Sequence, residues 1–299
     1  MTHSTVVRFL LLAMLWGSSF TLIKVSLEGL TPAQLVLSRL VLGAAVLLVV
    51  AAVRHVALPR SRAVWGHLVA AALFGNVLPF LLLSYGERTA GAGMAGVLIG
   101  ATPLLTMTIA YVALAGERTT VRKATGLVLG FLGIVVVLAP WREAAGSLGG
   151  EIACFGAAVS YAISFVYVRR FLSPRGLAPL ALAGGQLLMA VVLQALVSPL
   201  LAWGPVALTP RVLVSIVLLG VLSTGLAYVL YFGLIADIGA TSASAVNYVV
   251  PIAAVLIGVA FLGEAVTWNV VAGGVVVLLG MAYAENRLTT AKAAVLPHR

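Results

Sequence analysis

A short apolar stretch near the start of the chain, MLWGSSFTLIK, carries an indole, two serine hydroxyls and an ammonium group. At 100° per residue of a helix, Trp16, Phe20 and Lys24 form one stripe and Ser19 lies beside it. Aromatic walls with a few hydroxyl groups are typical of sites that bind small amphipathic molecules. The alternative is ordinary packing between helices, with the serine hydroxyls bonded to backbone carbonyls.

A second stretch, SYAISFVYVRR, repeats this pattern 145 residues later, with Tyr161 opposite Trp16 and Ser164 opposite Ser19. Two helices that carry the same groups at the same depth favour a cavity wall over packing alone. We therefore predict that these four residues bind a substrate.

Other polar and aromatic side chains also lie inside long apolar runs. A lipid-facing amide costs several kcal/mol, so asparagines in such runs are expected to face protein or a cavity. A single aromatic is more often part of the core, but together these residues extend the predicted binding set. The added members are Asn76, Phe80, Tyr228, Asn247 and Tyr248.

Two cations lie close to these groups in the sequence. Lys24 ends its apolar run, so its ammonium either extends to the membrane interface or belongs to the site. Arg39 lies well inside the next run, where a charge usually faces protein or water. Its partner is either a substrate carboxylate or a structural carboxylate such as Glu28.

Prolines inside two apolar runs, Pro103 and Pro251, each remove a backbone hydrogen bond and permit a kink. Their matching places in the two halves of the chain suggest hinges, although static packing bends are an equal alternative. Small-residue pairs, Gly96-xxx-Gly100 and Gly126-xxx-Gly130, are suited to close helix contact.

Several classes of chemistry are disfavoured. The single cysteine and the scattered histidines exclude an internal disulfide and indicate no metal site. No G-x-x-x-x-G-K-[ST] loop is present, and the GAGMAG match to a dinucleotide motif lacks the strand that such a site requires. No cofactor and no enzymatic activity are therefore expected. Because every carboxylate falls at or near the end of an apolar run, we also expect transport without a proton gradient.

Composition identifies the environment of these side chains. Hydrophobic residues make up 62% of the chain and charged residues 9%, which is typical of a membrane protein. The net charge of +10 comes from small groups between apolar segments, so nucleic acid is not an expected partner. Ten runs are long enough to cross a bilayer. They span residues 7–27, 32–53, 64–85, 91–113, 121–139, 150–170, 178–200, 211–234, 240–262 and 267–286.

Arginine and lysine are concentrated in alternate loops, which places both termini in the cytoplasm. The chain also repeats itself: Glu117 aligns with Glu264 and Gly133 with Gly280, each pair 147 residues apart. Five helices in each unit make the second copy inverted. We therefore predict two inverted five-helix repeats, residues 1–143 and 144–287, followed by a cytoplasmic tail, 288–299.

The segments LWGSSF, SRLVLGAAVLL, TPLLTMTIAYVALAGE and VVPIAAVLIGVAFLGE resemble the two EamA units of the drug/metabolite transporter superfamily. The resemblance covers nearly the whole chain. It implies a ten-helix carrier of the bacterial inner membrane that moves small metabolites, with aromatic amino acid exporters among the similar proteins. Alternatives are a multidrug efflux carrier and, with less support from the sparse polar residues, a channel. The expected partners are a small-molecule substrate and membrane lipid, not nucleotide, and the chain is expected to be a monomer or a weak homo-oligomer.

Overall fold

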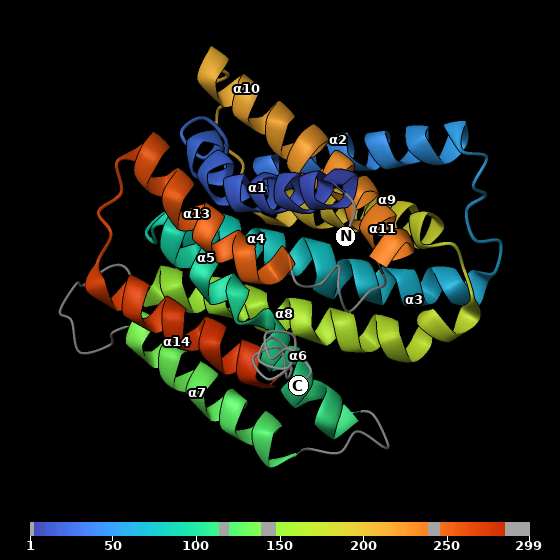
Figure 1. The fold of residues 1–299 in the computed structure, drawn as a ribbon. Helices are drawn as coiled ribbons and strands as arrows, with labels where there is room; N and C mark the ends of the chain where they lie inside the picture. Colours follow the sequence, from blue (N-terminus) through green and yellow to red (C-terminus); the bar gives the residue numbers. More distant parts are fainter. Residues whose placement is uncertain (1–2, 114–119, 139–147, 239–245, 285–299) are drawn as a thin grey trace.

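The computed structural model describes residues 3–113, 120–138, 148–238 and 246–284, and every regular element in these ranges is helical. Most helices run roughly along one direction, side by side (Figure 1). The elements, in chain order, are α1 (His3–Ser26), α2 (Pro32–Val53), α3 (Arg62–Ala72), η1 (Leu73–Val77), α4 (Leu78–Gly86), α5 (Ala92–Gly100), α6 (Thr102–Ala113), α7 (Val121–Leu138), α8 (Leu148–Phe171), η2 (Ser173–Arg175), α9 (Pro179–Val197), η3 (Ser198–Leu200), α10 (Pro210–Val217), η4 (Leu218–Leu226), α11 (Ala227–Ile238), α13 (Val246–Leu262) and α14 (Trp268–Ala284).

Seven stretches of the described chain are long and apolar enough to cross a membrane. Their outward faces are apolar: Val53 is 72% exposed, Val112 83% and Leu196 69%, as expected where lipid is the solvent. Two shorter apolar helices, Val249–Leu262 and Trp268–Gly280, follow. The seven stretches are His3–Ser26, Pro32–Val53, Arg62–Gly86, Ala92–Ala113, Leu148–Arg175, Pro179–Leu200 and Pro210–Leu234. The chain is thus an all-α, multi-pass membrane protein. The start of the run expected at 240–262 and the expected tail, 288–299, lie outside the described residues.

Two ends of the helix bundle matter for the site. The end that holds the last turns of α1, α4 and α13 and the first turns of α5 and α14 is called here the Lys24 end. It lies to the left in Figure 1. The opposite end holds the last turn of α8.

Helix starts follow from local sequence. Thr31 accepts a hydrogen bond from the amide of Gln34, and the Gln34 side chain accepts from the Thr31 amide, which forms a capping box before Pro32. Thr209 caps α10 in the same way through Val212, again just before a proline. These caps fix where α2 and α10 begin.

Glycines set the closest helix contacts. Gly96 and Gly100 of α5 face α13, and a Cβ on Gly100 would lie 2.5 Å from Pro251 Cγ. In the pair formed by α7 and α14, which lies along the lower edge in Figure 1, Gly280 approaches the backbone of Gly126 and Gly130. Both predicted small-residue faces are therefore helix interfaces.

Two helices that line the cavity contain π-helical segments, η1 and η4. Leu73 and Leu218, where they begin, are related by the same offset, 145 residues, as Trp16 and Tyr161. Such widened turns occur often at functional sites because they rotate the following side chains relative to the preceding ones. The chain thus adopts the same unusual backbone at matching places in its two halves.

The run expected at 91–113 is broken rather than continuous. α5 ends at Gly100 and α6 begins at Thr102, just before Pro103. Pro103 has no N–H to donate to the carbonyl of Ile99, and the Thr102 hydroxyl donates to that carbonyl instead, at 2.6 Å. Pro251, by contrast, lies inside a continuous α13.

Candidate functional site

A cavity of about 320 Å³ lies between the helices. Aromatic side chains are the largest group in its wall, and apolar side chains surround a smaller set of polar groups, as in sites for amphipathic ligands. The aromatic members are Trp16, Phe20, Phe80, Tyr161, Phe165, Tyr228, Tyr231 and Phe232. The polar members are Ser19, Arg39, Thr102, Ser164, Gln186, Ser223 and Asn247.

The wall includes most of the predicted binding residues. Trp16 packs against Tyr231 with ring centroids 5.3 Å apart, and Phe80 packs edge-on against Tyr161 at 6.5 Å. Tyr161 in turn stacks on Phe165 at 6.4 Å. The rings of the two repeated stretches therefore belong to one aromatic enclosure.

The two serines of the repeated stretches also have backbone partners. Ser19 donates to the carbonyl of Leu15, and Ser164 donates to that of Ala71. Each serine also lines the cavity. The backbone hydrogen bonds are those that the packing alternative expects, and the position in the wall is the one that the cavity alternative expects.

Asn76 is placed one layer behind the wall. It is fully buried, and its Oδ1 accepts a hydrogen bond from Gln186 Nε2 at 2.7 Å. Of this pair, the amide that reaches the cavity is Gln186, which the sequence analysis did not select. The argument used for Asn76, that an amide inside an apolar run needs a polar partner, would have found Gln186. The side chain of Tyr248 lies outside the part of the chain that is described.

Arg39 is the cation of the cavity. Its side chain is 6% exposed, its Nε donates to Thr224 Oγ1 at 2.9 Å, and its guanidinium lies 3.8 Å from the ring centre of Phe80. The alternative partner, Glu28, instead pairs with Arg211 at 3.4 Å. Among the described residues no carboxylate lies within ion-pair distance of Arg39. A buried cation held by a hydroxyl and a ring, and facing a cavity, is suited to an anionic ligand.

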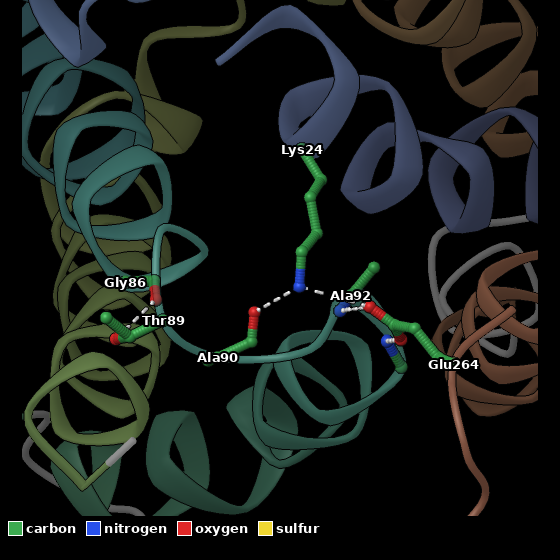
Figure 2. A network of polar contacts seen from close by, with 7 residues as sticks. Lys24, Gly86, Thr89, Ala90, Ala92 and Glu264 are labelled. Carbon is green, nitrogen blue, oxygen red and sulfur yellow. Dashed lines mark hydrogen bonds and ion pairs between the residues drawn. The ribbon is translucent and has the colours of Figure 1, made fainter. Parts of the chain in front are cut away.

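Lys24 neither lines the cavity nor extends outward. Figure 2 shows its Nζ between the carbonyl of Ala90, at 2.9 Å, and Glu264 Oε1, at 3.3 Å. Glu264 also accepts from the amides of Ala92, at 2.7 Å, and Gly93, at 3.1 Å, and so caps the first turn of α5. One network thereby joins α1, α5 and the connection between α13 and α14. Glu117, which the repeat pairs with Glu264, is outside the described residues.

This network closes the Lys24 end. Toward it the wall is buried, with Ile23 fully buried and Leu83 3% exposed. Toward the opposite end the wall is more open, and Phe165 is 52% exposed. Among the described residues, the cavity wall thus runs from Ile23 and Leu83, which are buried near the Lys24 end, to Phe165, which is half exposed, toward the opposite end.

The predicted hinges meet near the cavity. Pro251 lies against Gly100, next to the break between α5 and α6. Because proline has no N–H, the carbonyl of Asn247, four residues before Pro251, receives no helical hydrogen bond from it. Asn247 lines the cavity, so this carbonyl is a candidate acceptor for a ligand.

Comparison with known proteins gives the family. The model of the EamA-like transporter family matches residues 3–139 and again residues 148–284. "Uncharacterized transporter YdfC" of Bacillus subtilis is 29% identical over 272 residues, 90% of this chain and 87% of that protein. "Probable terminal-alkyne amino-acid exporter" of Streptantibioticus cattleyicolor is 28% identical over 91% of this chain and 90% of its own length.

An Escherichia coli protein, "Uncharacterized inner membrane transporter YedA", is 26% identical over 85% of this chain and 81% of its own length. A solved structure titled "Crystal structure of protein" has a TM-score of 0.67 and 23% identity, and the match covers 95% of this chain and 98% of that one. This last likeness concerns the fold alone. Since the family model matches both halves of the sequence, this chain belongs to the EamA-like transporter family.

Proposed function

We propose that this chain is a secondary carrier that moves amino acids with apolar or aromatic side chains across the inner membrane by alternating access. The two family matches, one in each half, support two five-helix repeats, 1–143 and 144–287. The paired π-helical segments η1 and η4 support the same duplication. In this proposal ten helices cross the membrane, and the repeats are inverted, an arrangement that recurs among alternating-access transporters.

The observation that carries the substrate class is Arg39 beside the aromatic enclosure. A buried cation without a carboxylate partner costs free energy, and a substrate carboxylate would offset that cost. The apolar part of the substrate would lie among Trp16, Tyr161 and Tyr231. Its ammonium group would donate to the carbonyl of Asn247 that Pro251 leaves without its helical donor.

The same charge argues against the alternative of a carrier for cationic drugs. The cavity wall includes a cation but no aspartate or glutamate among its described residues. A lipophilic cation would therefore meet repulsion from Arg39 with no acidic group to offset it. The closed Lys24 end likewise disfavours a channel, which needs one continuous path.

In this proposal the Lys24 end faces the outside, which the loop charges support, and the cavity approaches the cytoplasm, where it is suited to loading for export. We propose that the break between α5 and α6 at Pro103 and the kink at Pro251 change their bend as Lys24 and Glu264 separate. The cavity would then close toward the cytoplasm and open at the Lys24 end. No cofactor or nucleotide takes part in this cycle.

Counterflow tests the carrier directly. Proteoliposomes preloaded with unlabelled phenylalanine are expected to accumulate radiolabelled phenylalanine transiently, with an initial rate that saturates. Empty liposomes and liposomes loaded with a lipophilic cation serve as controls. Flux that rises linearly with concentration and shows no counterflow would identify a channel, and a chemically altered ligand would identify an enzyme.

Substitutions in the wall and directly behind it should separate a binding site from general packing. We expect Trp16→Ala, Tyr161→Ala and Asn76→Ala to lower phenylalanine exchange by about fivefold or more, since one lost aromatic or polar contact costs about 1 kcal/mol or more. Trp65→Ala and Trp203→Ala should change it little. These two indoles donate to the carbonyls of Pro59 and Ser198 at helix ends, away from the cavity. With the amount of protein matched, equal losses in both groups would contradict the proposed site.

A further inference from the structure

Glu87 is a carboxylate that the proposed transport cycle leaves without a role. It follows the last residue of α4 and is fully buried, although the sequence places it at a helix end. Its burial follows from close packing: a Cβ on Gly86 would lie 2.6 Å from both Gly150 O and Cys154 Sγ. Neither carboxylate oxygen has a hydrogen-bond partner among the described residues.

Among the described residues, the charges that act on Glu87 are those of Lys24, Arg39 and Glu264. The titratable groups around it are Lys24 on α1, Arg39 on α2, Glu151 and Cys154 on α8, and Glu264 after α13. Lys24 already pairs with Glu264, which also accepts two backbone amides.

An ionised, unpartnered carboxylate at such a position costs several kcal/mol. Burial accordingly raises the pKa of Glu87 well above its ordinary range. In the closed structure Glu87 therefore carries a proton, while Glu264 is the acid that contacts Lys24.

We propose that Glu87 is a proton-binding site tied to the Lys24 end: it holds a proton while this end is closed and releases it to the outside when this end opens. The inference rests on the alternating-access cycle proposed above. On opening, Lys24 leaves Glu264 and pairs with Glu87. The O–H bond of Glu87 breaks, its proton passes to external water, and its carboxylate receives the ammonium of Lys24. Charge and protons balance without any other reactant.

The direction of the pH effect follows from proton counting. The closed state binds one proton more than the open state, so external acid favours the closed state and alkali favours the open one. The ratio of open to closed protein should rise by up to about tenfold per pH unit between the pKa of Glu87 in the open state and its raised pKa in the closed state. The sequence analysis, which expected transport without a proton gradient, did not predict this dependence on external pH.

Accessibility at the Lys24 end tests the inference without a substrate. In the full chain with Cys154→Ala, a cysteine at Ile23, which is fully buried beside Lys24, reports opening to a membrane-impermeant maleimide added from outside. Its labelling rate is divided at each pH by that of Val266→Cys, a 48% exposed position in the connection before α14. This division cancels most of the pH dependence of thiol ionisation.

We expect the normalised rate at Ile23 to rise with external pH and to stay at its low, acid value throughout in Glu87→Gln. Glu87→Asp should keep the rise but displace it along the pH axis, and it decides the question if the glutamine variant does not fold. A rise that is unchanged in both variants, or no rise in the parent protein, would overturn the proton site while leaving the carrier intact. If Ile23 is never labelled, even with Glu264→Gln, both the proton site and alternating access fail.

Discussion

Replacing Arg39 by methionine should lower the rate of phenylalanine exchange by about a hundredfold or more. Methionine keeps much of the volume of the side chain but removes the charge that we propose binds the substrate carboxylate. Loss of one partner of a buried charge pair typically costs about 3–5 kcal/mol, which corresponds to such a factor. The measurement is counterflow in proteoliposomes with the amount of inserted protein held constant.

Two controls distinguish binding from structure. Arg211→Met removes an arginine whose side chain is 59% exposed and pairs with Glu28, and it should leave exchange nearly unchanged. Phenylalanine amide, which has no carboxylate, should be little affected by Arg39→Met compared with phenylalanine. If Arg39→Met lowers the flux of both ligands equally, Arg39 holds the helices together rather than binding the substrate.

Gly280→Ala should be among the most destabilising single-methyl changes in the chain. The added Cβ would lie 2.7 Å from both Gly126 O and Gly130 N, which are backbone atoms that cannot turn aside. Relief requires α14 to move away from α7, so the substitution loses contacts along a whole helix pair. Overpacking of this kind costs about 1–3 kcal/mol or more. We expect a lower melting temperature and less monodisperse protein in detergent.

The matched control is Gly66→Ala in α3, where an added Cβ meets nothing within 4 Å. The chemical change is the same, and alanine is the better helix former, so stability should be unchanged or slightly higher. Thermal unfolding of both variants, followed by size-exclusion chromatography, makes the comparison. Similar melting temperatures for the two variants would show that α7 and α14 do not pack as described.

The sequence by itself determined the class of protein and the positions of its helices. A bilayer offers no hydrogen-bond partner to the backbone, so long apolar runs must be helical wherever they occur. The helices that the structure describes accordingly overlap all ten predicted runs. The helix contacts at Gly96 and Gly130 could also be predicted from the sequence, because close contact between helices requires small side chains at helical spacing.

Much of the site could be predicted for the same reason. Trp16 and Tyr161 were predicted to bind substrate because two related helices carry aromatic and polar groups at matching positions on one face. Both residues line the cavity. Asn76 and Gln186 show what the sequence pattern could not predict. The sequence indicated that an amide needs a polar partner, but the rotation of each helix decides which amide faces the cavity and which lies behind it.

Only the tertiary structure decided the roles of the charges. Lys24 and Glu264 are 240 residues apart, and no local pattern connects them. Glu87 lies at the end of a helix, where a residue of a membrane protein is expected to contact water. The close approach of Gly86 to Gly150 nevertheless buries Glu87. Whether a carboxylate at a helix end is ionised depends on what packs over that end. In this chain, the segment that packs over Glu87 is α8, which begins about 60 residues later. The sequence around Glu87 does not indicate that contact.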